Sequence, residues 1–270
     1  MDTVLSCSAL NFVSGRLNNE QLMEVTLAAI PVIKASGFPN MEVYIREAKG
    51  QDLARLLKET RVQNINIQSV HFSKPLLNHQ PDRCLNTLSG LINAAAFLGA
   101  TVGVLHPPGK LESRTCLDNC RKVLETALPI AETQSVILAL ENLGSPQYLA
   151  LLAQLINEYP SPNLGITLDL KFLYASGHSL DAFFQVLGQK IVNVHINEFT
   201  GSLLDTDGHR QYPQLGKGIV DFVKLAQLIR SYRCSGIWTL ETLLNGDQVA
   251  ELAQAKAFMA ELLEFPERRN

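Results

Sequence analysis

Eight short apolar runs alternate with eight longer amphipathic runs from one end of the chain to the other. The first kind is typical of buried strands and the second of surface helices, so the alternation predicts consecutive β-α units of an α/β protein. We expect strands at Val4–Leu10, Glu42–Arg46, Asn64–His71, Thr101–His106, Val136–Glu141, Leu164–Asp169, Ile191–Ile196 and Gly236–Glu241. We expect helices at Glu20–Ser36, Gln51–Arg61, Pro81–Leu98, Glu112–Thr133, Pro146–Glu158, Leu173–Leu187, Asp221–Tyr232 and Asp247–Phe265.

Several predicted strands are apolar almost without interruption, as in Val136–Leu140 and Ile237–Leu240. Strands covered on both faces of a parallel sheet have this character. Eight such strands, each followed by a helix, fit a closed (β/α)8 TIM barrel. No linker rich in Pro, Gly or Ser breaks the series, so we predict one barrel domain over residues 1–270. An open doubly wound sheet competes, but the first strand lacks the Gly-rich turn of its nucleotide-binding form.

The net charge, the cysteine pattern and the apolar runs limit the expected partners and the expected cellular compartment. A formal charge of −3 gives no broad cationic field, which argues against nucleic acid as a partner. The five cysteines contain no CxxC pair, so neither a disulfide framework nor a zinc knuckle is indicated. Asp2 stands where a signal peptide would carry positive charge, and the apolar run near Ala94–Leu105 is too short to span a bilayer. We expect a cytoplasmic protein with no membrane partner, whose outer helices offer a surface for a homodimer.

Six successive predicted strands, from the third to the eighth, end on an imidazole or a carboxylate. One such residue alone would be explained as a hydrogen-bonded strand terminator or a helix N-cap. In a TIM barrel, however, the active site lies at the C-terminal ends of the strands, and six such residues at that level predict a site. They are His71, His106, Glu141, Asp169, His195 and Glu241.

The carboxylates of this set would repel one another in a confined barrel mouth unless a cation lay between them. Glu141, Asp169 and Glu241 together with His195 would form a shell composed mainly of oxygen atoms. Such a shell suits Mg²⁺, Mn²⁺ or another borderline divalent metal better than a structural thiolate zinc site does. The residue types therefore predict a metal centre.

Several short motifs resemble the xylose-isomerase-like TIM barrel superfamily, which includes sugar and sugar-phosphate isomerases, epimerases, inosose dehydratases and, more distantly, the endonuclease IV group. The motifs are Leu140-Glu141-Asn142, Leu168-Asp169, Val194-His195-Ile196-Asn197, Leu240-Glu241, and Gly216-Lys217-Gly218 followed by Asp221-Phe222. The resemblance extends from about the third to the eighth predicted strand. It implies one divalent ion (Mn, Mg, Zn or Co) held by Glu141, Asp169, His195 and Glu241, with Glu141 and Glu241 also moving protons.

The chain departs from the family pattern after the sixth predicted strand. Family members often carry Asp-x-x-His there, whereas this chain has Asp169-Leu170-Lys171-Phe172. In the endonuclease branch the missing histidine completes a further metal position with residues resembling Asp207 and His209, and in epimerases it contacts the substrate. The change therefore counts against a three-metal cluster and a standard epimerase pocket, unless Lys171 or His178 covers the gap.

Together these features predict a divalent-metal-dependent isomerase or epimerase that acts on a sugar or sugar-like polyol through an enediolate. Glu141 and Glu241 would serve as paired general base and acid. Contacts to the small-molecule substrate are expected from His71, His106, His209 and Arg210. In an endonuclease-like site, the first two of these would instead bind additional zinc.

Three other functions stay open: an apurinic-site endonuclease-like zinc phosphodiesterase, an inosose-type dehydratase, and a non-catalytic carbohydrate-binding barrel. The turn Gly216-Lys217-Gly218 would either present N–H groups to a phosphate or simply lead into a helix capped by Asp221. Glu42 and Asn11 could reach the pocket, but we assign neither a role. The identity of the sugar depends on loops that carry little pattern.

Overall fold

Eight parallel strands close into a barrel in the computed structural model, which describes residues 3–73, 77, 80–109, 114–208, 210–234 and 236–264. Each strand pairs with the next one along the chain, and the last pairs with the first. The predicted TIM barrel is therefore confirmed. The strands are β1 (Val4–Ser8), β2 (Asn40–Ile45), β3 (Asn66–Phe72), β4 (Val102–Leu105), β5 (Ile137–Glu141), β6 (Leu164–Asp169), β7 (Ile191–Ile196) and β8 (Ile237–Leu240).

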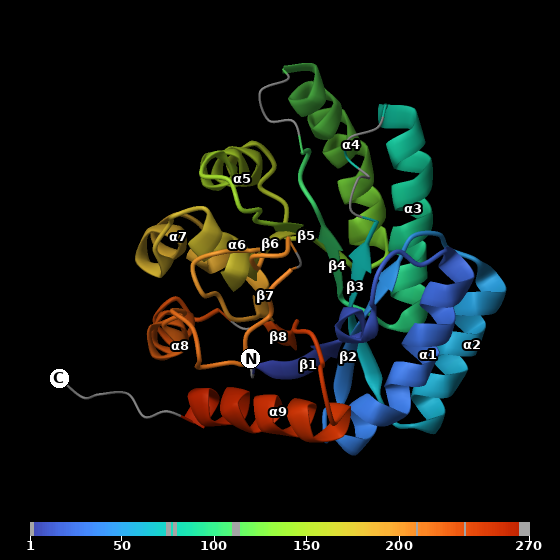
Figure 1. The fold of residues 1–270 in the computed structure, drawn as a ribbon. Helices are drawn as coiled ribbons and strands as arrows, with labels where there is room; N and C mark the ends of the chain where they lie inside the picture. The colour runs from blue at the N-terminus through green and yellow to red at the C-terminus, as the bar shows by residue number, and fades with distance from the viewer. Residues whose placement is uncertain are drawn as a thin grey trace.

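Helices form the outer layer and surround the strands (Figure 1). They are α1 (Asn19–Ala35), α2 (Gly50–Val62), α3 (Pro81–Leu98), α4 (Arg114–Thr133), α5 (Gln147–Glu158), α6 (Leu170–Ala175), α7 (Leu180–Leu187), α8 (Phe222–Ser231) and α9 (Gln248–Glu264). Among the residues that the structure describes, the short 3-10 helices η1 (Ala9–Phe12) and η3 (Gly188–Lys190) follow β1 and α7. Within the described residues, none of the helices has both the length and the apolar character that crossing a membrane requires.

One predicted helix, Leu173–Leu187, is two helices in the structure. The break lies at Gly177, whose φ of 76° is in the left-handed region that glycine adopts readily. After this turn, the side chain of Ser179 accepts a hydrogen bond from the N–H of Ala182 and starts α7. The earlier helix, α6, begins directly after Asp169, so Asp169 both ends β6 and is the N-cap of α6.

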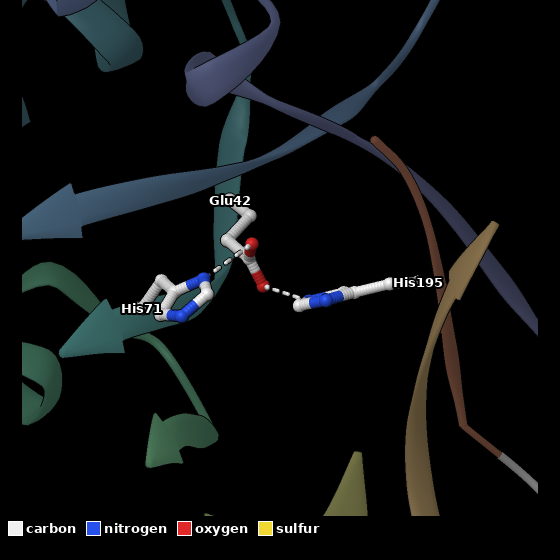
Figure 2. A group of neighbouring side chains, drawn as sticks. All are labelled: Glu42, His71 and His195. Atoms are coloured by element: carbon white, nitrogen blue, oxygen red, sulfur yellow. Dashed lines mark hydrogen bonds and ion pairs between the residues drawn. The ribbon is translucent and has the colours of Figure 1, made fainter. Parts of the chain in front are cut away.

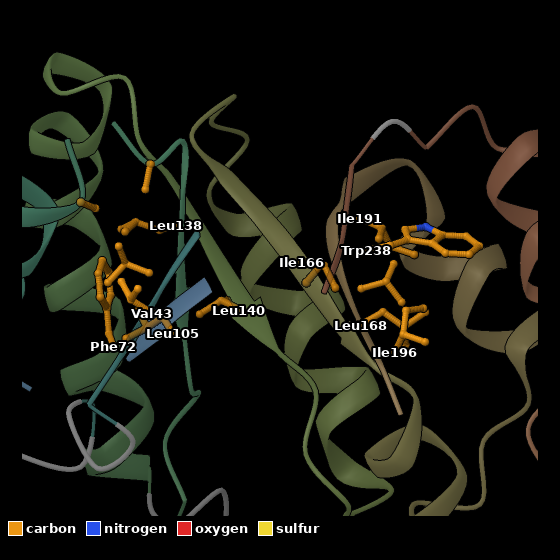
Figure 3. Close-up of a cluster of buried hydrophobic side chains, with 14 of the residues drawn as sticks. Val43, Phe72, Leu105, Leu138, Leu140, Ile166, Leu168, Ile191, Ile196 and Trp238 are labelled. Atoms are coloured by element: carbon orange, nitrogen blue, oxygen red, sulfur yellow. The ribbon is translucent and has the colours of Figure 1, made fainter. Parts of the chain in front are cut away.

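Apolar side chains on the outer face of the strands form the core between barrel and helices. Alternate residues of a strand point to opposite faces. Those that point outward are large, aliphatic or aromatic, and buried. Figure 3 shows part of this layer, with Val43, Phe72, Leu105, Leu138, Leu140, Ile166, Leu168, Ile191, Ile196 and Trp238 labelled.

The intervening residues of the same strands face the barrel interior and become polar toward the strand ends. A small apolar cluster of Val102, Val104, Ala139 and Ile237 is separate from the outer core. Buried polar residues include Ser69 and Asn193, whose side chains both donate to Glu42. The barrel interior therefore presents polar side chains toward the C-terminal ends of the strands.

Candidate active site

The strand-end residues predicted to form a site meet because neighbouring strands are held in register. Asp169 of β6 is the register partner of His195 of β7. Glu141, the last residue of β5, is the register partner of Thr167 of β6. Glu241 follows β8 directly, and all of these residues are buried. The barrel closure therefore brings residues from four strands to one place.

Three carboxylates converge on the Nδ1 atom of His195. Nδ1 lies 2.7 Å from Oε1 of Glu141, 3.1 Å from Oε2 of Glu241 and 3.8 Å from Oδ2 of Asp169. The four side chains each offer one ligand atom, and these atoms lie within 4.8 Å of one another. This is the set that the sequence analysis assigned to one divalent ion.

Asp169 is held in place from several sides. Its Oδ1 accepts from the N–H of Phe172 at 2.8 Å, which caps α6, and its Oδ2 accepts from Nδ2 of Asn197 at 3.0 Å. Its backbone N–H donates to Oδ1 of Asn142 at 2.7 Å, and its carbonyl accepts from Nδ2 of the same residue. The carboxylate is thereby oriented toward the barrel axis before any ligand binds.

Asn11 performs a similar task for the chain around Glu241. Its Nδ2 donates to the carbonyl of Leu240 at 3.1 Å, and its Oδ1 accepts from the N–H of Thr242 at 2.8 Å. The amide side chain therefore holds the backbone on both sides of Glu241. Asn11 thus fixes the backbone that carries Glu241.

Glu42 lies between two imidazole rings at the centre of the barrel (Figure 2). Its Oε2 is 3.3 Å from Nε2 of His195, and its Oε1 is 3.7 Å from Nδ1 of His71. Ser69 Oγ donates to Oε2 at 2.7 Å, and Asn193 Nδ2 also reaches this oxygen at 3.4 Å. A proton on Nε2 of His195 can therefore point to Glu42, which leaves Nδ1 as a lone pair for a metal.

Sequence reasoning left Glu42 without a role. It stands in the middle of β2 between Met41 and Val43, which belong to the apolar outer core. An acidic residue at the inward position of an otherwise apolar strand was the available signal. A buried carboxylate at such a position requires partners, and here the barrel interior supplies them.

Attraction between the carboxylates and the imidazoles shifts the pKa values of Glu42, Glu141 and His195. Burial alone would raise the pKa of Glu42, but His195 and His71 lower it to about 2. Burial likewise opposes ionisation of Glu141, whose pKa is nevertheless held well below its usual range by His106 and His195. For His195, burial favours the neutral ring, but Glu42 and Glu141 raise its pKa well above the ordinary value. Glu42 and Glu141 are therefore ionised beside a protonated imidazole of His195.

His71 and His106 complete two further groups of potential ligands. Their Nε2 atoms are 3.1 Å apart, and Nε2 of His106 lies 2.5 Å from Oε2 of Glu141. His71 and His106 form one such group with Glu141, and His71 also belongs to a group with Glu42 and His195. Both histidines predicted to contact the substrate therefore adjoin the four-residue set.

The buried carboxylate of Glu198 fixes the long segment between β7 and α8. Its Oε1 accepts from the N–H groups of Phe199 and Val220, and its Oε2 accepts from that of Gly216. A Cβ on Gly218 would lie 2.2 Å from the carbonyl oxygen of Phe199, so a larger residue does not fit there. The Gly216-Lys217-Gly218 turn thus directs the Gly216 amide to a carboxylate rather than to an external anion.

Lys171 and Arg210 line a cavity of about 250 Å³ beside the strand-end cluster. Its remaining walls are Phe172, Leu203, Leu204, Gln211 and Tyr212. A second cavity of about 500 Å³ lies between the β7–α8 segment and α9, and Tyr212 belongs to both walls. Arg210, predicted to bind substrate, is therefore placed at a cavity.

The other loop predictions have different outcomes. His209 lies outside the described residues. Asp207 is exposed, and its N–H donates to Oδ1 of Asp205; among the described residues it joins no group that could hold a metal. His178 contacts the carbonyl of Pro146 at 2.9 Å, so it does not occupy the place of the family histidine.

The donor set fits a divalent cation. The buried Oε2 of Glu141 receives no hydrogen bond of acceptable geometry, although Nε2 of His106 is close to it. Three carboxylates packed this closely repel one another, and a cation between them would relieve that repulsion. Oxygen-rich shells with one imidazole are typical of Mg²⁺, Mn²⁺ and Zn²⁺ sites. The group could therefore both bind a metal and leave glutamates beside it for proton transfer.

Comparison with known proteins agrees with the barrel fold. The family model described as xylose isomerase-like TIM barrel matches residues 30–262. No curated protein sequence matches the chain. Similar solved structures include an L-ribulose 3-epimerase (17% identity, 98% and 95% of the two chains covered, TM-score 0.76). A D-allulose 3-epimerase from Methylomonas sp. in complex with D-allulose is 15% identical over 96% and 97% of the chains, with a TM-score of 0.76. The IolI protein with a bound zinc atom is 18% identical over 97% and 98%, with a TM-score of 0.74.

Proposed function

Since this chain belongs to the xylose isomerase-like TIM barrel family, we propose that it is a divalent-metal-dependent isomerase or epimerase of a sugar or sugar-like polyol. The observation that carries the proposal is the convergence of Glu141, Asp169 and Glu241 on Nδ1 of His195. Sugar epimerases among the structural neighbours support the same class of reaction.

The four converging residues would hold one ion, with His195 contributing Nδ1 and the carboxylates their oxygen atoms. A bound divalent metal would act as a Lewis acid toward carbonyl and hydroxyl oxygens of the substrate. Glu42 would keep the His195 ring oriented through Nε2. The zinc atom in the IolI structure supports a metal in this kind of barrel.

Proton transfer would fall to Glu141 and Glu241. They come from β5 and the end of β8, which are separated around the barrel, so they approach a bound sugar from different sides. One would remove a proton from a carbon next to the carbonyl, and the other would return a proton to the same or the neighbouring carbon. His71, His106 and Arg210 would contact the substrate hydroxyls.

One observation favours a second candidate. His71, His106 and Glu141 form another group of potential metal ligands next to the first. A cluster of two or more ions would suit a phosphodiesterase of the apurinic-site endonuclease type. The formal charge of −3 and the replacement of a family histidine by Phe172 favour the sugar enzyme instead.

Two measurements test the proposal. Elemental analysis of metal-replete protein is expected to give one divalent ion per chain, whereas two or three zinc ions would favour the phosphodiesterase. Proton exchange at carbon would then be followed by NMR in heavy water, using a panel of ketohexoses, ketopentoses and inososes. Solvent deuterium should enter one position of at least one sugar. Loss of water without exchange would indicate a dehydratase, and no reaction would indicate a binding protein.

A further inference from the structure

We propose that Lys171 is a catalytic residue that donates a hydrogen bond to the substrate oxygen on which negative charge develops during proton transfer. The proposal rests on the isomerase or epimerase function above. It assigns to Lys171 a part of the reaction that the carboxylates cannot supply, because those groups hold the metal or move protons.

The first reason is that Lys171 is buried without a polar partner. The residue is 5% exposed, yet among the described residues no hydrogen bond or ion pair reaches its ammonium group. Its Nζ lies 4.3 Å from the ring centroid of Tyr212 and 5.1 Å from that of Phe172. Aromatic faces stabilise a cation but accept none of its three N–H donors in the way an oxygen would. A buried ammonium with unused donors is prepared for a ligand oxygen.

The second reason is its position between the carboxylate cluster and a cavity. Lys171 lines the cavity of about 250 Å³ that Arg210 and Tyr212 also line. It also lies within electrostatic reach of Asp169 and Glu241. Its backbone is fixed, since its N–H donates to Oδ1 of Asn197 at 2.7 Å. A substrate that occupied the cavity and reached the metal site would pass this ammonium.

The third reason is the balance of charge. Three carboxylates around a divalent ion leave one negative charge uncompensated, the ionised Glu42 beside His195 adds another, and both would oppose formation of an enediolate. The ammonium of Lys171 supplies the missing positive charge at the edge of the cluster. A preorganised donor aimed at developing negative charge is among the largest sources of rate enhancement.

A purely structural role is the competing explanation. In that case Lys171 would only hold the carboxylates in place, and its removal would weaken metal binding. Under our proposal its removal takes away a cation that repels the metal, so metal affinity stays the same or increases. Metal affinity thus separates the two explanations without any need for turnover.

The experiment compares wild type with Lys171→Met, Lys171→Arg and a matched control, Lys58→Met, whose lysine is exposed on α2 and lines neither cavity. Calorimetry first measures Mn²⁺ affinity. It then measures the binding of glycolohydroxamate, a small mimic of an enediolate, to the metal-loaded proteins. We expect Lys171→Met to bind Mn²⁺ at least as tightly as wild type and to bind the mimic about 10- to 100-fold more weakly. Lys171→Arg should keep most of the affinity for the mimic, and Lys58→Met should match wild type.

Two results would overturn the proposal: equal binding of the mimic by wild type and Lys171→Met, including no binding by either, or a parallel loss of Mn²⁺ affinity. Thermal unfolding shows whether each variant is folded, and Lys171→Gln, which also removes the positive charge, replaces Lys171→Met if the Met variant does not fold. Failure of the proposed function would look different. In that case wild type would bind the mimic through Lys171 but exchange no sugar proton in heavy water.

Discussion

The strand-end cluster and the β7–α8 segment form two walls of the same site, but they are built differently. In the cluster, each charged side chain comes from a different strand and is placed by barrel register, as in the pairing of Asp169 with His195. In the segment, one side chain, Glu198, accepts hydrogen bonds from the N–H of the adjacent Phe199 and from the more distant N–H groups of Gly216 and Val220.

This difference indicates which wall is rigid and which can change. Register involves backbone hydrogen bonds along entire strands, so a single substitution does not displace Asp169 or His195. The β7–α8 segment depends on one buried carboxylate and on a glycine, Gly218, that permits close approach of Phe199. We therefore expect substitutions in the cluster to change chemistry and those in the segment to change stability.

The largest effect is expected from Glu241→Gln. If the cluster carries the chemistry, loss of this carboxylate should lower kcat by about 10²- to 10⁴-fold, because general acid–base assistance is lost. The measurement is NMR proton exchange at saturating metal on whichever sugar wild type converts. Glu261→Gln, at an exposed position of α9, is the control. Wild-type turnover by the Glu241 variant would remove the cluster from the mechanism.

Glu42→Gln tests whether the contact between Glu42 and Nε2 of His195 contributes to metal affinity. Groups that orient a metal-binding histidine typically contribute 10- to 100-fold in metal affinity. We expect Mn²⁺ binding to weaken by about that factor in calorimetry, because the amide no longer fixes Nε2 of His195 as the protonated nitrogen. The exposed Glu47 supplies the control, Glu47→Gln. Unchanged affinity would show that the cluster orients His195 without Glu42.

Glu198→Gln tests the other wall. The variant loses charge-assisted acceptance of backbone N–H groups, and we expect the free energy of unfolding to fall by roughly 1–2 kcal/mol. Proteolysis within residues 199–221 should become faster, while Mn²⁺ affinity should stay near the wild-type value. Denaturant titration and limited proteolysis measure the two effects. A large loss of metal affinity would mean that the two walls are coupled more tightly than their hydrogen bonds indicate.

The smallest effect concerns pH. Metal binding requires Nδ1 of His195 to lose its proton, and the pKa of this residue in the metal-free protein is raised. Mn²⁺ affinity should therefore increase with pH, by at most about tenfold per unit for one released proton, until the pH exceeds that raised pKa. The stability that protonated His195 contributes to the metal-free protein is complete below the ordinary pKa of 6.5 and is lost above the raised value. Calorimetry in buffers of different ionisation enthalpy counts the proton.

The cluster was predictable from sequence because two signals coincide in it. The run before Glu141 is apolar throughout and the run before Asp169 is interrupted only by Gly165 and Thr167, and both strands end where the apolar pattern ends. For Glu42 only one of these two signals is present. Its neighbours in the strand are apolar, but the strand does not end at Glu42 and continues to Ile45. Glu198 gave none, because its partners in the β7–α8 segment have no periodic pattern that would reveal them. Contacts made by irregular backbone depend on tertiary folding, which local sequence does not encode.

Tyr212 belongs to the walls of both cavities and also supports the ammonium of Lys171. One aromatic ring therefore has two roles: it forms part of the wall of both cavities, and it stabilises a charge beside the carboxylates. In a redesign of this barrel, a substitution of Tyr212 would change substrate range and reactivity together. Trimming the ring to admit a longer sugar would also weaken the environment that Lys171 requires, so a second substitution would have to restore it.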